Sequence, residues 1–126
     1  MKDREAIIRN YINAYNKFDV EGMLADMAED IVFQNISGNE VNMTLNGIDA
    51  FREQAEQTKA YFSTRHQAIS NIEHRGDETE VAISYVAILA INLPNGMKAG
   101  DEIKLSGRSV FKFVHDKIIT ALTDLS

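Results

Sequence analysis

Asn35 is the first residue whose position in the sequence points to chemistry. In the stretch DIVFQNIS, residues 30–37, the side chains of Ile31, Phe33 and Asn35 fall on one face of a predicted strand. That face begins with two apolar side chains and then presents an amide. Asn35 therefore either marks the end of the strand and bonds a loop, or lines a cavity in which a polar group binds.

Two tyrosines and a serine are further candidates for hydrogen-bonding chemistry. Tyr11 and Tyr15 lie in the apolar stripe of a predicted first helix, so their hydroxyls either reach a pocket or are satisfied at the edge of the core. Ser109 shares a strand face with Phe111 and Phe113, which points it inward. Its small side chain could donate a hydrogen bond or simply leave room for a neighbour.

A general base would have to come from His66 or Asp124. Histidine titrates near neutral pH, which makes His66 a candidate, although a strand histidine that bonds backbone or a neighbouring acid is the simpler interpretation. Asp124 could reach the mouth of a pocket or cap the last strand. His74 and His115 sit beside predicted turns, and no histidine or carboxylate spacing completes a metal site, so we expect neither metal nor cofactor.

Composition limits the classes of partner. The chain has 126 residues, a formal net charge of −6 and no cysteine, which suits a single domain without disulfides. An acidic chain without a basic stripe is not expected to bind nucleic acid. The sequence shows neither the apolar core of a signal peptide nor an apolar run that could span a membrane as a helix. We therefore expect a cytoplasmic protein.

The elements that position these residues follow from periodicity. Asp3 can cap a first helix, Asp19 a short second helix, and Asn46, with Asp49 three residues on, a third helix. Phe51, Ala55, Thr58 and Phe62 would share a face of the third helix. Strands are predicted at residues 31–36, 64–75, 79–93, 102–114 and 117–125, with a possible short strand at 41–45.

Helices followed by strands predict an α+β fold, in which helices cover one face of a curved antiparallel sheet. The predicted strand 79–93 is apolar on both faces: Val81 and Ile83 lie on one, Val86 and Ile88 on the other. The helices can cover only one of these faces. A second copy of the sheet is the economical cover for the other, so we expect a homodimer through the sheet.

Three stretches of the sequence resemble the nuclear transport factor 2-like superfamily, and most of all its SnoaL-like branch, which includes ketosteroid isomerases and polyketide cyclases. They are NYINAYNKFDVEGMLADMAEDIVF, TRHQAISNIEHRGDETEVAISYV and KIITALTD. The resemblance implies one SnoaL-like domain over residues 1–126. It implies a cone-like curved sheet wrapped around the N-terminal helices (a cystatin-like α+β barrel), a pocket between helices and sheet, and dimerisation through the sheet.

The resemblance also tests the isomerase chemistry. The tyrosine that donates to the oxyanion in the isomerase relatives corresponds to Tyr11, and the carboxylate that shuttles the proton corresponds to Asn35. The late-strand acid corresponds to Ser109, and a supporting tyrosine to Ala55. An amide is not a useful base at neutral pH, so isomerisation by that mechanism is not expected. Asn35 would serve in recognition instead.

Three hypotheses for function remain open. The first is a largely apolar pocket that binds a small apolar or carbonyl-bearing molecule. The second is an isomerase- or cyclase-type lyase with His66 or Asp124 as base and Tyr11 as oxyanion donor. The third is a non-catalytic dimeric interaction module. The predicted pocket lining is Tyr11, Tyr15, Met27, Phe33, Asn35, Phe51, Phe62, His66, Ser109 and Phe111.

Overall fold

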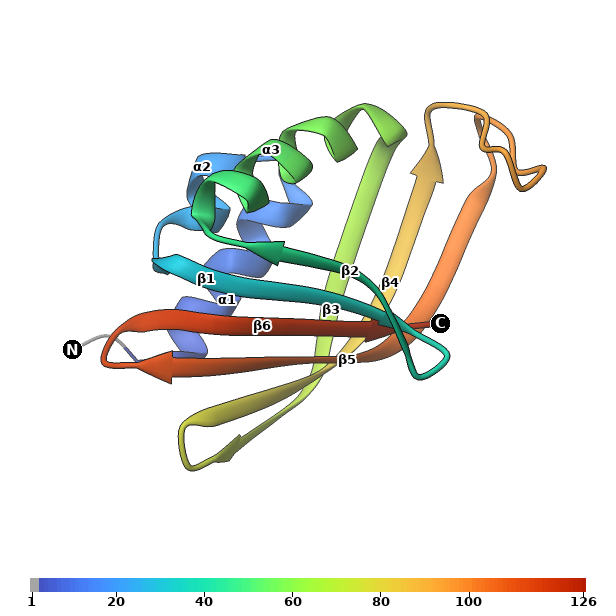
Figure 1. Ribbon diagram of the computed structural model, residues 1–126. Helices are drawn as coiled ribbons and strands as arrows, with labels where there is room; N and C mark the ends of the chain where they lie inside the picture. The colour runs from blue at the N-terminus through green and yellow to red at the C-terminus, as the bar shows by residue number, and fades with distance from the viewer. Residues whose placement is uncertain (1–2) are drawn as a thin grey trace.

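Three α-helices lie against one curved six-stranded sheet in the computed structural model, which describes residues 3–126 (Figure 1). None of the described helices is long and apolar enough to cross a membrane. The elements in chain order are α1 (Arg4–Asn16), α2 (Val20–Leu24), β1 (Met27–Ser37), β2 (Glu40–Asn46), α3 (Ile48–Thr58), a 3₁₀ turn (Lys59–Tyr61), β3 (Phe62–Arg75), β4 (Glu78–Leu89), β5 (Glu102–Val114) and β6 (Lys117–Leu125).

The strand order is β2-β1-β6-β5-β4-β3, and the predicted α+β class with a curved sheet is confirmed. One detail differs from the expectation of an antiparallel sheet: β1 and β6 pair in parallel. These two strands come from opposite ends of the chain, so no hairpin turn imposes an antiparallel direction on them. Within residues 3–126, β2 and β3 form the two edges of the sheet and do not pair with each other, which leaves the barrel unclosed.

The first two helices begin as the sequence predicts. The Asp3 carboxylate accepts a hydrogen bond from the Glu5 backbone N–H, and the Asp19 carboxylate accepts one from the Gly22 N–H. The apolar stripe of α1 is buried against the sheet, with Ile8 fully enclosed. Asp19 packs so close to Gly22 that a Cβ there would overlap its carboxylate, which accounts for a glycine inside this short helix.

The predicted cap of the third helix is wrong. Asn46 is still part of β2, where it pairs with Val32, and Gly47 occupies the N-cap without a side-chain hydrogen bond. Gly47 has a φ of 94°, a value that favours glycine, and its N–H donates to the Ile31 carbonyl at 2.7 Å. Strand pairing therefore extends one residue further than the cap signal suggested.

Strand β4 separates an inner face from an outer one. Val81, Ile83 and Tyr85 are buried toward the helices, whereas Val86 on the other face is 40% exposed. The strand ends at Leu89 rather than at residue 93, and Pro94 lies in the loop that joins β4 to β5. The homodimer expected from the apolar outer face of this strand stays a prediction.

Gly107 marks the place where β5 runs past the end of β6. It pairs with Leu125, the preceding Ser106 exchanges two backbone hydrogen bonds with Ser126, and beyond Ser106 β5 pairs with β4 alone as far as Glu102. A Cβ at Gly107 would overlap the backbone carbonyl oxygen of Asp124. Figure 1 shows β5 curving along its length toward the loop that connects it to β4. The projecting end of β5 supplies one wall of the cavity described next.

Candidate functional site

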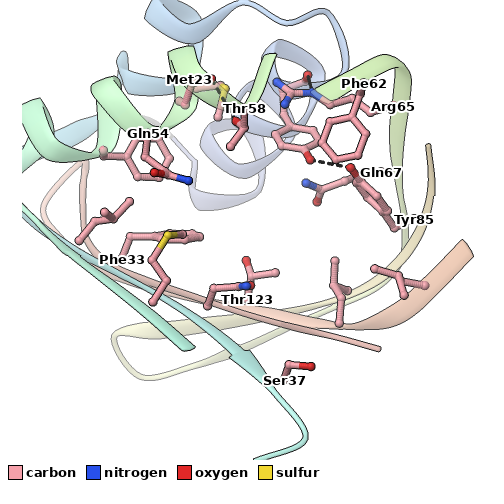
Figure 2. Close-up of a pocket in the computed structure, with 18 of the residues that line it drawn as sticks. Met23, Phe33, Ser37, Gln54, Thr58, Phe62, Arg65, Gln67, Tyr85 and Thr123 are labelled. Carbon is pink, nitrogen blue, oxygen red and sulfur yellow. Dashed lines mark hydrogen bonds between the residues drawn. The ribbon is translucent and has the colours of Figure 1, made fainter. Parts of the chain in front are cut away.

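A cavity of about 480 Å³ lies between the helices and the concave face of the sheet (Figure 2). Figure 2 shows Gln54 projecting from α3 on one side of the cavity, with Phe33 and Thr123 on the sheet opposite. Gln67 and Tyr85 lie together at one end of the cavity. The volume suits a small organic molecule. The lining consists of Tyr11, Tyr15, Met23, Phe33, Asn35, Ser37, Asn42, Met43, Leu45, Phe51, Gln54, Ala55, Thr58, Phe62, Arg65, Gln67, Tyr85, Ile103, Leu105, Thr123, Leu125 and Ser126.

Three tyrosines from two elements meet in this cavity. The hydroxyls of Tyr15 on α1 and Tyr85 on β4 lie 2.9 Å apart and share one hydrogen bond. The ring of Tyr11 packs edge-on against Phe111, with centroids 5.8 Å apart, and no described residue bonds its hydroxyl. Three phenol groups carry three hydroxyl hydrogens. Since one is used between Tyr15 and Tyr85, two remain for an acceptor in the cavity.

The hydroxyls of Tyr11 and Tyr85 are held in their neutral, donating form. Burial raises the pKa of Tyr11 above its ordinary value; the neighbouring Tyr15 raises it further, and Arg65 opposes the shift. Burial likewise raises the pKa of Tyr85, reinforced by Tyr15 and by the hydrogen bond between the two. At neutral pH Tyr11 and Tyr85 are therefore protonated and can donate but do not act as bases.

Arg65 is a buried cation at the edge of the same cluster. It is only 4% exposed, and its Nε donates to the backbone carbonyl of Tyr15 at 2.9 Å. Its guanidinium carbon lies 3.7 Å from the centre of the Tyr15 ring and 4.4 Å from that of Phe18. The Nη2 atom is buried and has no hydrogen-bond partner among the described residues.

The structure places Asn35 in the cavity lining and also gives it a partner. Its Nδ2 donates to Oδ1 of Asn42 on β2 at 3.0 Å. The expectation that Asn35 ends the strand and bonds a loop is wrong, because β1 continues to Ser37 and Asn42 belongs to β2. The amide bonds across the β1–β2 hairpin while it lines the cavity. The side chains of Gln54 and Gln67 add two further amides to the lining.

Six of the ten predicted lining residues come together around the cavity: Tyr11, Tyr15, Phe33, Asn35, Phe51 and Phe62. Met27, Ser109 and Phe111 are instead buried in the core and are absent from the lining. The Ser109 hydroxyl lies 3.1 Å from that of Thr123, which does line the cavity. Ser109 thus supports a lining residue and does not reach the interior itself.

His66 and Asp124 lie outside the cavity. His66 is exposed, because its neighbours Arg65 and Gln67 point inward and alternation along β3 turns His66 to the outer face. Asp124 alternates in the same way with Thr123 and Leu125, both of which line the cavity. No group of three His, Asp or Glu residues in the described chain could hold a metal ion.

Sequence reasoning missed Arg65, Gln67 and Tyr85. Tyr85 could have been found, because it continues the buried face of β4 set by Val81 and Ile83. Arg65 and Gln67 gave no such signal. They are polar residues in a mostly polar strand, and only contact with the end of α1 makes their face an inner one.

The model of the SnoaL-like domain family matches residues 8–121, which is most of the chain. This protein therefore belongs to the SnoaL-like domain family. Its inner cavity and its curved sheet over N-terminal helices agree with what the resemblance implied. Among curated proteins, no significant match is found.

Solved structures share the fold at low sequence identity. IdmH from Streptomyces antibioticus, provisionally assigned as a polyketide cyclase, is 14% identical with a TM-score of 0.81, covering 99% of this chain and 93% of its own. An epoxide hydrolase of M. tuberculosis described as LEH-like is 13% identical with a TM-score of 0.76, covering 96% and 80%. A cystatin-fold protein from Novosphingobium aromaticivorans is 17% identical with a TM-score of 0.73, covering 100% and 99%.

Proposed function

We propose that this protein binds a small, largely apolar molecule that carries a hydrogen-bond acceptor, in the cavity between α1, α3 and the sheet. The observation that supports this most is the combination of apolar walls with two tyrosine hydroxyl hydrogens that no described residue accepts. Rings and aliphatic side chains supply contact area, while Tyr11 and the Tyr15–Tyr85 pair retain hydrogens for an acceptor. A carbonyl-bearing compound fits this chemistry.

Binding is favoured over proton transfer by a protein base. The lining contains no carboxylate, imidazole or amine side chain among the described residues. An isomerase- or cyclase-type lyase that used His66 or Asp124 would need them to reach the interior, and both face away. A pure interaction module would be favoured by a filled interior, whereas this one holds about 480 Å³.

A pair of tryptophan substitutions on neighbouring residues of β5 tests the proposal. Leu105 lines the cavity, and Lys104 points to the opposite face of the same strand. We expect 7-methoxycoumarin, an apolar carbonyl compound, to raise the melting temperature of the wild type and of Lys104→Trp. Leu105→Trp, whose indole fills the cavity, should show no increase.

The size of the effect is set by mass action. A ligand at about 100 times its Kd stabilises the folded state by about 2.7 kcal/mol. Equal increases in all three proteins would place binding outside the cavity. No increase for the wild type with 7-methoxycoumarin and other carbonyl-bearing aromatics would contradict the proposed function.

A further inference from the structure

Arg65 is the one charged side chain in the described lining, and it has no counter-charge. The other lining side chains are apolar, or neutral hydroxyls and amides. None of the ion pairs in the described chain includes Arg65, although the residue is only 4% exposed. A buried charge without a partner is costly. Its presence needs a physical reason.

Part of that reason is structural. The Nε of Arg65 bonds the Tyr15 carbonyl in the last turn of α1, where the helix carries its negative partial charge. That partial charge is about half an elementary charge, so it cannot neutralise a whole guanidinium. The buried Nη2 also stays without a partner. Capping α1 therefore accounts for one donor of Arg65 but leaves net positive charge beside the cavity.

The donors beside this charge are suited to one oxygen atom. Tyr11 and the Tyr15–Tyr85 pair retain two hydroxyl hydrogens, and the Gln67 amide lies at the same end of the cavity (Figure 2). The titratable side chains that line the cavity with Arg65 are these three tyrosines, from α1 and β4. No acidic side chain is among them. An anion placed there would meet hydrogen-bond donors and a positive field, with no carboxylate side chain in the described lining to oppose it.

Resting on the proposed function, we propose that the natural ligand class is apolar molecules that carry an anionic oxygen, such as an enolate, a phenolate or a carboxylate. The oxygen accepts hydrogen bonds from Tyr11 and from the Tyr15–Tyr85 pair. Arg65 supplies the balancing charge through the Tyr15 ring on which it stacks. Arg65 acts here on the ligand's charge without a direct contact and is therefore a positioning residue.

The test compares two dyes of one shape. 7-Hydroxycoumarin ionises near neutral pH and its two forms differ in excitation spectrum, whereas 7-methoxycoumarin has no such proton. With the wild type we expect the acid dissociation constant of bound 7-hydroxycoumarin to rise at least about tenfold over that of the free dye. An unchanged or lower constant, with 7-methoxycoumarin still bound, would overturn this inference and leave the proposed function standing. If neither dye binds, the proposed function fails and the inference with it.

Substitutions at Arg65 separate its charge from its capping role. Arg65→Met removes the charge, so the shift in the dissociation constant should be lost while 7-methoxycoumarin still binds. Arg65→Lys keeps the charge but loses the planar stack and the geometry of the bond to Tyr15. It should lower the melting temperature yet preserve most of the shift.

Two further results test the roles of Arg65 and of the tyrosine hydroxyls in this shift. If Arg65→Met does not fold, the wild-type shift and its preservation in Arg65→Lys still support the inference. Tyr11→Phe, which leaves only the one free hydrogen of the Tyr15–Tyr85 pair for the oxygen, should reduce that shift. A shift that persists in folded Arg65→Met would contradict the role given to this residue.

Discussion

The side-chain amide of Asn16 bonds both backbone groups of Gln67: its Oδ1 accepts from the Gln67 N–H at 2.7 Å and its Nδ2 donates to the Gln67 carbonyl at 3.1 Å. Gln67 lies on β3, an edge strand, whose outward backbone groups have no neighbouring strand. The last residue of α1 thus takes the place of a strand partner. This contact holds the tyrosine-bearing helix against the strand that carries Arg65 and Gln67.

Removing this amide should loosen the end of α1. Asn16→Ala leaves two backbone groups without partners, so we expect the free energy of unfolding to fall by about 1–3 kcal/mol. Asn16→Asp keeps the acceptor but repels the Gln67 carbonyl, and should be destabilising as well. Asn13→Ala, at an exposed position on the same helix, is the control and should change stability by less than about 0.5 kcal/mol. Urea denaturation measures all three, and an Asn16→Ala variant as stable as the control would refute this role.

The raised pKa values of Tyr11 and Tyr85 predict a loss of stability at alkaline pH. An unfolded tyrosine ionises near pH 10, whereas these two stay protonated to higher pH in the folded protein. The folded state then binds more protons than the unfolded state, so stability is intact below about pH 10 and falls as the pH rises further. Tyr11→Phe and Tyr85→Phe should each flatten this decline. Unfolding free energies measured at about pH 7 and about pH 11 give the comparison; a wild-type value that does not fall would contradict the prediction.

Sequence patterns were sufficient for the order of the helices and strands and for the fold class, although not for every boundary, because local periodicity sets the type of each element. The caps at Asp3 and Asp19 and the buried face of β4 were all readable in this way. The parallel pairing of β1 with β6 was not, since it joins the two ends of the chain. The same reason explains which residues of the candidate site were predicted. Aromatic lining residues such as Phe33 and Phe51 were predicted, whereas the inward position of Arg65 depends on a contact between distant segments of the chain.

Gly107 should not tolerate a side chain. Alanine there would place its Cβ on the carbonyl oxygen of Asp124, a backbone atom that can move only if β5 and β6 separate. We expect Gly107→Ala to lower the free energy of unfolding by about 1–3 kcal/mol. Ser106→Ala, at the exposed residue before it, is the matched control and should be close to neutral. If Gly107→Ala unfolds at the same denaturant concentration as that control, the close approach is not required.

The homodimer predicted from the sequence can be tested at Val86. This valine is 40% exposed on the outer face of β4, beside half-buried Ala82 and Ile88. If a second copy covers this face, Val86→Glu should convert a dimer to a monomer in analytical ultracentrifugation. Val41→Glu changes a valine that is 51% exposed on the edge strand β2, and should leave the dimer intact. A wild-type protein that sediments as a monomer at high concentration would rule the dimer out.

The way β5 overruns β6 has a consequence for how the family can diversify. Ile103 and Leu105 line the cavity from the end of β5 that extends past β6, and at Gly107, close to the start of that end, β5 lies too near the Asp124 carbonyl for a side chain. The space available to a ligand thus depends in part on Gly107, which does not itself line the cavity. Substitutions near Gly107 can change the volume of the cavity while the side chains that line it stay the same. Relatives with the same lining residues therefore need not bind ligands of the same size.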